Sequence, residues 1–357
     1  MRTWLITGGA GFIGSNFARR IRAKGAARIV NLDKLTYAGH RENLDSLVGD
    51  DGHIFIRGDI RDRGLVRELL TRYQPTAVIN FAAESHVDRS IMAPEDFLGT
   101  NIGGTLALLE ESLRFWRALS AEKAQEFRFL QISTDEVFGS LEPGDAPFTE
   151  THPFAPNSPY AASKAGADHM VRAYHATFGL PTLTTHCSNN YGPYQHPEKL
   201  IPLMILNAWQ GLPLPVYGDG RQIRDWLYVD DHCGALEAVL AGGAPGGTYN
   251  IGGDSERSNL DIIRLITERL DALHPAGAPH AQLIKHVQDR PGHDRRYAIN
   301  ADKMRRDLQW RPRVPLEEGL RRTVEWYVER TDWVQAVCGT AHQKWVAQQY
   351  GAGKVSA

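Results

Sequence analysis

A glycine-rich segment follows the first apolar run of this chain and constrains its fold more than any other feature. The apolar run, TWLI at positions 3–6, is typical of a short buried strand, and TGGAGFIG at positions 7–14 leads from it into an amphipathic stretch. Glycines at positions 8, 11 and 14 allow a tight strand-to-helix turn, a close approach of the backbone to a pyrophosphate, and close packing of helix on strand. The segment therefore predicts a dinucleotide-binding turn, with the phosphates at the helix N-terminus.

A second strand supports this interpretation, because three glycines also occur in turns that bind nothing. The run RIVNL at positions 28–32 ends at Asp33. A carboxylate at that position can accept hydrogen bonds from the adenosine ribose and would repel a 2′-phosphate, so it favours NAD over NADP. Lys34 follows directly and could soften that repulsion.

Two further segments carry side chains suited to proton transfer. STDEVFG, at positions 133–139, follows an apolar run, and YAASK occupies positions 160–164. Tyr160 and Lys164 are four residues apart, so on a helix they share one face, and we expect the Lys164 ammonium to lower the pKa of the Tyr160 phenol. Asp135 and Glu136 provide a second acid/base station, although acidic residues at a helix start also serve simply as caps.

The order of apolar patterns predicts an α/β fold. Strands are expected near 54–56, 77–80, 127–133 and 183–187, and helices near 12–23, 64–72, 97–119 and 160–178, which is the rhythm of a doubly wound parallel sheet. After residue 188, Pro and Gly punctuate shorter elements, with helices expected near 200–210, 229–240 and 260–273. We predict a dinucleotide-binding domain at 1–188 and a smaller mixed α/β lobe at 189–357, with some segments crossing back.

Composition excludes several classes of protein. A formal net charge of −2, without a basic tract, argues against nucleic-acid binding. The chain has no apolar run of about 18 residues and no signal-like start, so we expect a soluble cytoplasmic protein without a membrane partner. The three cysteines are far apart, and the 14 histidines show no metal-ligand spacing, so neither disulfides nor a metal site is indicated.

The motifs carry a family resemblance. TGGAGFIG, Asp33, FAA at 81–83, STDEVFG and YAASK resemble the extended short-chain dehydrogenases/reductases that act on nucleotide sugars. AAESHVDRSI from Ala82, SNNYGPYQHPEKLIP from Ser188, GDGRQIRDWLYVDDH from Gly218 and DRPGHDRRYAIN from Asp289 are closer to the dTDP-glucose 4,6-dehydratases. Asp135 is the most specific element, since related 4-epimerases and decarboxylases usually lack an acid at that position. The resemblance implies a Rossmann-like sheet with a substrate-binding lobe.

The same resemblance implies a set of site residues for NAD and dTDP-glucose. The implied catalytic residues are Thr134, Asp135, Glu136, Tyr160 and Lys164. The implied NAD-binding residues are Gly8, Gly11, Phe12, Ile13, Gly14, Asp33, Asp59, Ile60, Ala82, Tyr160 and Lys164. The implied substrate-binding residues are His86, Thr134, Asn189, Lys199, Arg224, Asn259, Arg290 and His293.

In the implied reaction, C4 of the sugar is oxidised, water is lost across C5 and C6, and hydride returns to C6. Two alternatives stay open from the sequence. A UDP-sugar 4-epimerase or decarboxylase would use Tyr160, Lys164 and Thr134 and leave Asp135 without a role. A non-catalytic NAD-binding regulator is the third possibility, although such proteins usually lose the Tyr or the Lys. The resemblance also implies a homodimer paired through the helices expected at 97–119 and 160–178.

Overall fold

A seven-stranded, wholly parallel β-sheet forms the centre of the molecule in the computed structural model, which describes residues 2–289 and 291–339. Its strand order is β10-β6-β5-β4-β1-β2-β3, and all neighbouring strands pair in parallel. The strands are β1 (Thr3–Thr7), β2 (Arg28–Asp33), β3 (His53–Arg57), β4 (Ala77–Asn80), β5 (Arg128–Thr134), β6 (Thr182–Cys187) and β10 (Thr248–Ile251). The predicted doubly wound sheet is confirmed, and the carboxyl ends of its strands share one edge.

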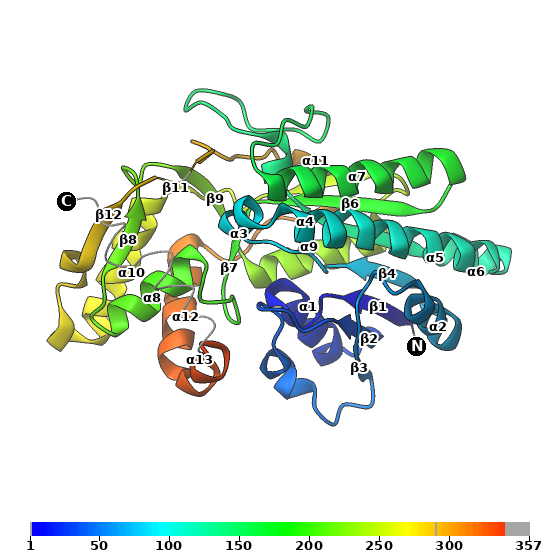
Figure 1. Ribbon diagram of the computed structural model, residues 1–357, viewed down its shortest axis with the longest axis horizontal. Helices are drawn as coiled ribbons and strands as arrows, with labels where there is room; N and C mark the ends of the chain where they lie inside the picture. The colour runs from blue at the N-terminus through cyan, green and yellow to red at the C-terminus, as the bar shows by residue number, and fades with distance from the viewer. Residues whose placement is uncertain (1, 290, 340–357) are drawn as a thin grey trace.

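Helices cover both faces of this sheet, as the alternating side chains of β1 require. Trp4 and Ile6 belong to the core under one layer of helices, whereas Leu5 belongs to the core under the other. The first layer consists of α1 (Phe12–Ala23), α9 (Val229–Gly242) and α11 (Asp302–Leu308), and the second consists of α2 (Arg63–Tyr73), α5 (Thr105–Arg117) and α7 (Pro159–Phe178). Figure 1 shows α5 and α7 side by side.

The single helix expected over 97–119 is wrong in its first part. The chain forms α4 (Pro94–Phe97), a π-helical stretch η2 (Leu98–Gly104) and then α5. A Cβ at Gly104 would lie 2.4 Å from Cδ1 of Ile60, and a Cβ at Gly166 of α7 would lie 2.7 Å from Cδ1 of Ile102. Glycines therefore let η2 pack tightly between α7 and the loop after β3. Helix periodicity does not predict this packing, because it depends on residues that are distant in the sequence.

A smaller mixed α/β lobe lies beside the large sheet (Figure 1). Tyr191, Trp226 and Tyr228 contribute to a separate apolar core there. Its elements are β7 (Asn189–Tyr191), β8 (Leu214–Tyr217), β9 (Ile223–Tyr228), β11 (Glu256–Ser258), β12 (Ile284–Val287), α8 (Leu200–Trp209), α10 (Asn259–Leu273), α12 (Leu316–Glu329) and α13 (Thr331–Val337). The boundary at residue 188 stays a prediction. Segments from the second half of the chain cross back to the large domain, where β10 extends the sheet and α9 and α11 cover one of its faces.

Short elements complete the described fold. They are η1 (Arg41–Leu47), α3 (Val87–Met92), α6 (Ala121–Glu126), η3 (Asp135–Phe138), η4 (Pro275–Gly277) and η5 (His280–Leu283). Within the described residues, no helix is long and apolar enough to cross a membrane.

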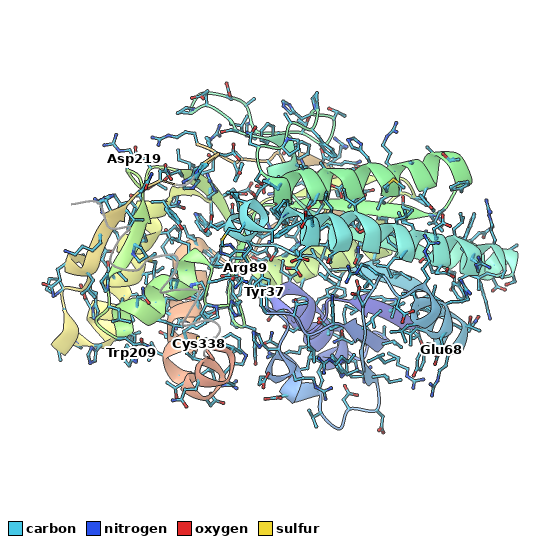
Figure 2. The ribbon with its side chains drawn as sticks, viewed as in Figure 1. Tyr37, Glu68, Arg89, Trp209, Asp219 and Cys338 are labelled. Atoms are coloured by element: carbon cyan, nitrogen blue, oxygen red, sulfur yellow. The ribbon has the colours of Figure 1, made fainter. Side chains whose placement is uncertain are left out.

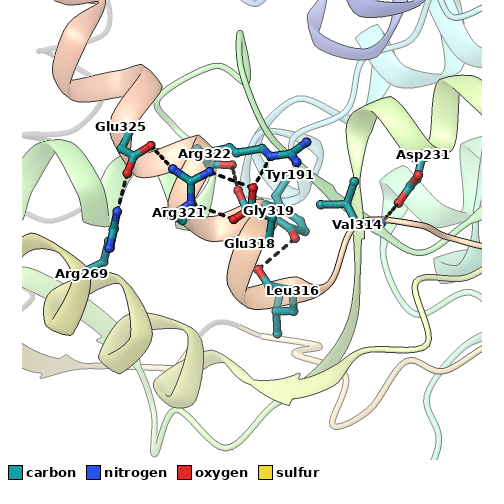
Figure 3. A network of polar contacts seen from close by, with 11 residues as sticks. Tyr191, Asp231, Arg269, Val314, Leu316, Glu318, Gly319, Arg321, Arg322 and Glu325 are labelled. Carbon is teal, nitrogen blue, oxygen red and sulfur yellow. Dashed lines mark hydrogen bonds and ion pairs between the residues drawn. The ribbon is translucent and has the colours of Figure 1, made fainter.

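Polar contacts run along α12 and link it to α10 (Figure 3). Glu318 accepts from Arg321 at 2.7 Å and from Arg322 at 2.7 Å, and Glu325 joins Arg321 to Arg269 of α10. Ion pairs at the protein surface contribute little to stability, because solvent screens them. Just before α12, the backbone N–H of Val314 donates to the buried Asp231 of α9 at 2.8 Å, a partly buried contact that joins the lobe to the large sheet.

Candidate active site

The glycine-rich turn lies at the carboxyl edge of the sheet, where β1 meets α1. Gly8 has φ +70, and a Cβ there would lie 2.6 Å from the backbone nitrogen of Ala82. A Cβ at Gly14 would lie 2.4 Å from the carbonyl oxygen of Gly8. Gly11 occupies the N-cap of α1 without a side-chain hydrogen bond, so backbone N–H groups of the first turn remain for an anion. The turn fits a dinucleotide pyrophosphate, because only glycine permits this close backbone.

Asp33, the last residue of β2, supplies the carboxylate beside this turn. Its Oδ2 accepts a hydrogen bond from the N–H of Ala10 at 2.8 Å, and its Oδ1 accepts one from Leu35 at 2.8 Å. Burial raises the pKa of Asp33, and these two hydrogen bonds oppose that rise. The backbone therefore fixes the carboxylate at the position that suits a ribose.

Lys34 points to another partner. Its ammonium lies 2.9 Å from Oδ2 of Asp59, which also accepts from Arg61 at 2.7 Å. Burial pushes the pKa of Asp59 up, but the hydrogen bonds from Arg61 and Lys34 outweigh it and hold that pKa below its usual range. Because Asp59 engages Lys34, this lysine offers less charge to a 2′-phosphate, and the arrangement favours NAD over NADP.

One cleft contains most of the residues expected to form the site. Its wall carries residues from the turn, from the ends of β2, β4, β5 and β6, and from α7. Of the expected residues, the lining includes Gly8, Gly11, Phe12, Ile13, Gly14, Asp33, Asp59, Ile60, Ala82, Thr134, Asp135, Glu136, Tyr160, Lys164, Asn189 and Lys199. The sheet topology explains this gathering, since parallel strands bring their carboxyl ends together.

The turn after β5 holds the acidic pair. The Thr134 hydroxyl caps η3 by accepting from the N–H of Glu136 at 3.3 Å, and it lies 3.3 Å from Oδ1 of Asp135. Asp135 is 1% exposed. Burial raises its pKa well above the usual value, and the charges of Glu136 and Asp225 raise it further. Asp135 is thus suited to hold a proton that it can donate.

The Tyr160 and Lys164 pair lies at the start of α7, whose N-cap Ser158 accepts from the N–H of Ala161 at 3.1 Å. Both side chains are buried. The expected lowering is not the net result in this structure, because burial and the charge of Glu136 raise the pKa of Tyr160 well above its usual value. The Lys164 ammonium donates instead to the carbonyl of Ile132 at 2.6 Å, and burial lowers its own pKa.

Comparisons with known proteins agree with this geometry. The sequence model of the family described as GDP-mannose 4,6 dehydratase matches residues 5–323. A dTDP-glucose 4,6-dehydratase of Xanthomonas campestris is 57% identical over 340 residues, which are 94% of this chain and 96% of the relative. The chain belongs to the dTDP-glucose 4,6-dehydratase family.

Solved structures place the fold in the same group. A dTDP-glucose 4,6-dehydratase of Streptomyces venezuelae, solved with NAD and dTDP, superposes with a TM-score of 0.85 at 46% identity, covering 93% of this chain and 98% of that one. A UDP-glucose 4-epimerase of Thermus thermophilus, solved with NAD, has a TM-score of 0.81 at 30% identity and covers 92% of this chain and 100% of that one. The fold is thus shared with epimerases, while the sequence is closer to the dehydratases.

The residues expected to bind the nucleotide are only partly gathered. Asn189 and Lys199 line the cleft, and Lys199 donates to the carbonyl of Ser85 at 2.9 Å. Arg290 lies outside the described residues. In the part of the chain that the structure describes, the lining of this cleft does not include four other expected residues, which are His86, Arg224, Asn259 and His293.

These four residues lie on different segments outside the lining of the cleft. His86 is buried at the N-cap of α3, just beyond Ser85. Arg224 is buried, donates to the carbonyl of Asp294 at 2.9 Å, and still opposes the rise in the pKa of Asp135. Asn259 is the first residue of α10. Nδ1 of His293 lies 2.6 Å from Oδ1 of Asp289.

The sequence reasoning missed a polar group on the cleft wall. Glu198 lines the cleft, is 3% exposed, and accepts from Arg89 at 3.3 Å. The Arg89 guanidinium lies 3.8 Å from the ring centre of Tyr37, and Figure 2 labels this pair where the small lobe meets the large sheet. Burial raises the pKa of Glu198, while Lys199 and Arg89 oppose the rise. The segment PEK at 197–199 contains both charged residues, but the sequence prediction includes only Lys199.

Proposed function

We propose that this chain is an NAD-dependent hydro-lyase that converts dTDP-glucose to dTDP-4-keto-6-deoxyglucose and water, in deoxysugar biosynthesis. The observation that carries the proposal is Asp135, a buried carboxyl with a raised pKa, beside Glu136 and in the same cleft as Tyr160 and Lys164. A simple dehydrogenase or epimerase needs no second acid. The names of the relatives, dTDP-glucose 4,6-dehydratases, agree with this use of Asp135.

The first role belongs to α7 and Thr134. When bound, NAD supplies the oxidant for sugar C4 and the reductant for C6. Tyr160 takes the proton of the C4 hydroxyl, while the Thr134 hydroxyl hydrogen-bonds the C4 oxygen. Because burial raises the pKa of Tyr160, its ionisation in this step needs a positive charge nearby, and Lys164 on the same helix face is the candidate.

The acidic pair performs the second step. With a ketone at C4, the C5 hydrogen becomes acidic, and Glu136 removes it as a proton. Asp135 gives its own proton to the C6 hydroxyl, which leaves as water while the C5–C6 double bond forms. The split between a protonated Asp135 and a basic Glu136 follows from burial and from the repulsion between neighbouring carboxylates.

Remote binding of the nucleotide would orient the sugar for these transfers. We assign Asn189 and Lys199, on the cleft wall, to the diphosphate side. His86, Arg224, Asn259 and His293 complete the binding set as a proposal, together with Arg290. The solved relative that carries dTDP supports a thymidine nucleotide as the handle.

Isotope labelling tests the proposed function directly. With C4-deuterated dTDP-glucose, we expect the deuterium at C6 of the product and solvent hydrogen at C5, since Glu136 exchanges its proton with water. Mass spectrometry of the product fragments measures both positions, and unlabelled dTDP-glucose in D₂O is the complementary control. An epimerase or a decarboxylase would restore the label to C4, so label found at C4 would exclude a 4,6-dehydratase.

A homodimer is part of the proposal, as is a cytoplasmic location. Apolar side chains are exposed near α7: Met92 is 76% exposed, Leu98 is 53% exposed, and α3 and η2 both pack on that helix. Paired with a second copy, α5 and α7 could form a four-helix interface. Cys187 and Cys233 are buried free thiols, which suits a reducing compartment.

Sedimentation equilibrium at micromolar concentration measures the oligomeric state. The expected mass is twice the 39.8 kDa of one chain. Leu98→Asp should weaken the dimer, because it places a charge in the proposed apolar contact. Val48→Asp, at another exposed apolar position, is the matched control. A wild-type protein that stays monomeric would exclude the dimer.

A further inference from the structure

Asp168, on α7, is a buried carboxylate that the proposed chemistry does not use. Tyr160, Lys164 and Asp168 are spaced four residues apart, so their side chains follow one face of the helix. Asp168 is 4% exposed. A carboxylate removed from water in this way is costly unless other groups hold it.

Two residues from neighbouring strands hold this carboxylate. The Ser133 hydroxyl donates to Oδ2 of Asp168 at 2.6 Å, and Nε2 of His186 lies 3.1 Å from the same oxygen. Ser133 and His186 face each other in the register of β5 and β6, and the next pair in that register is Thr134 with Cys187 on the cleft wall. One oxygen of Asp168 therefore connects the helix of Tyr160 and Lys164 to the strand end that carries Thr134.

The surroundings of His186 fix which ring nitrogen carries a proton. The ring is 1% exposed, and the rings of Phe138 and Phe154 meet it edge-on at centroid distances of 4.9 and 5.5 Å. The carboxylate facing Nε2 requires an N–H there. Among the described residues, Nδ1 of His186 has no hydrogen-bond partner.

Asp168 also acts on Lys164. Burial lowers the pKa of Lys164, while the Asp168 carboxylate on the same helix raises it. The ammonium donates to the carbonyl of Ile132 at 2.6 Å, in the strand that also carries Ser133. Asp168 thus favours the charged form of Lys164 and orders the backbone around it.

We propose that Asp168, with Ser133 and His186, is a positioning unit that fixes the Tyr160 and Lys164 helix against the Thr134 turn. The kinetic consequences of this inference rest on the proposed function, whereas the hydrogen bonds that define the unit are independent of it. Ser133 lines the cleft, whereas Asp168 and His186 are outside its lining. In this assignment the carboxylate of Asp168 acts through Lys164 and Thr134.

The first test reads the His186 ring in the purified protein without substrate. Nitrogen-15 NMR of histidine-labelled wild type should show His186 protonated at Nε2, and Asp168→Leu, which removes the acceptor, should lose that signature. His186→Gln identifies the resonance by its disappearance. A wild-type His186 that is neutral and protonated at Nδ1 would overturn the positioning unit, because that tautomer cannot donate to Asp168.

The second test measures kcat, KM and their pH dependence with dTDP-glucose. Asp168→Asn should lower kcat by about 10²-fold, the cost of a misplaced reacting group, with KM for dTDP-glucose unchanged. Removing the carboxylate lowers the pKa of Lys164 further, so the ammonium is lost at lower pH. In single-turnover measurements, the alkaline limb of C4 oxidation, the step that uses Lys164, should therefore move to lower pH. An alkaline limb that stays in place in folded Asp168→Asn would contradict the proposed effect on Lys164.

Matched variants separate positioning from simple loss of stability. His186→Gln keeps an N–H donor near the Nε2 position and should retain most of kcat. His186→Leu has no donor and should lose most of kcat. If Asp168→Asn does not fold, the comparison of these two variants takes its place. Asp231→Asn removes another buried carboxylate, which accepts from the N–H of Arg313 at 2.9 Å and of Val314 at 2.8 Å. Figure 3 shows the contact between Asp231 and Val314. It should lower the melting temperature without moving the alkaline limb. Equal limb shifts in Asp168→Asn and Asp231→Asn would overturn the inference.

The two tests also keep the inference separate from the proposed function. A wild-type protein that does not convert dTDP-glucose, yet shows His186 protonated at Nε2, would refute the function and support the positioning unit. Conversion of dTDP-glucose by a wild type with the Nδ1 tautomer would support the function and refute the unit.

Discussion

Tyr160→Phe is expected to abolish oxidation at C4, with a loss in single-turnover rate of at least about 10³-fold, within the range of a lost general base. The phenol oxygen is the only atom removed, and the ring stays in its buried site at the start of α7. Binding of dTDP should stay near wild type, because the phenol acts on the sugar hydroxyl and not on the diphosphate.

Single-turnover absorbance of reduced nicotinamide measures the first result, and titration calorimetry with dTDP measures the second. Tyr174→Phe is a matched control: this tyrosine is also buried on α7, but its hydroxyl donates to Glu110 away from the cleft lining. It should change stability without changing C4 oxidation. Loss of dTDP binding in Tyr160→Phe would show that the residue is structural.

Asp135→Asn is expected to slow the loss of water by about 10²–10⁴-fold, while C4 oxidation keeps most of its rate. An amide has the shape of the carboxyl group but cannot give a proton to the C6 oxygen. Reduced nicotinamide should then accumulate transiently in stopped flow, because the step after oxidation has become slow. Asp51→Asn, on an exposed surface turn, is the control and should turn over normally.

The pH dependence gives a second measure of Asp135. Burial and the charge of Glu136 raise its pKa, so the protonated acid persists to higher pH than for an ordinary aspartate and is lost as pH rises through that raised value. The rate of water loss in wild type should therefore fall on the alkaline side, and this limb should be absent from Asp135→Asn. Normal turnover of the variant would assign the acid to another group.

Local patterns were sufficient for the elements that support the site. The helix predicted over 12–23 is α1, and the predicted strands of the sheet, α2 and α7 begin and end within a few residues of their predicted bounds. α5 begins later than predicted, and β10 and α11 were not predicted. Hydrophobic period and glycine spacing report such features because they depend on neighbours along the chain. The gathering of Asp33, Thr134 and Asn189 at one edge could also be foreseen, since parallel strands align their carboxyl ends.

Longer-range contacts account for the errors. The π-helical stretch η2 depends on the packing of Gly104 against Ile60, which is distant in sequence. Lys34 pairs with Asp59 from the loop after β3, and Glu198 pairs with Arg89 from α3. In both cases the partner comes from a distant segment, so the sequence did not predict the pair. No spacing along the chain indicates such pairs, because their geometry follows from strand order and from the meeting of the two lobes.

By itself, the sequence determined which side chains can transfer protons. It also determined the glycine turn and the parallel sheet that carries these side chains. Only the tertiary structure decided their ionisation and their partners. Burial raises the pKa of Tyr160, against the prediction made from Lys164, and the carboxylate of Asp168 reaches Ser133 and His186 across two strands. The physical reason is that desolvation and charge interactions depend on everything packed around a group, which is fixed only when distant segments have come together.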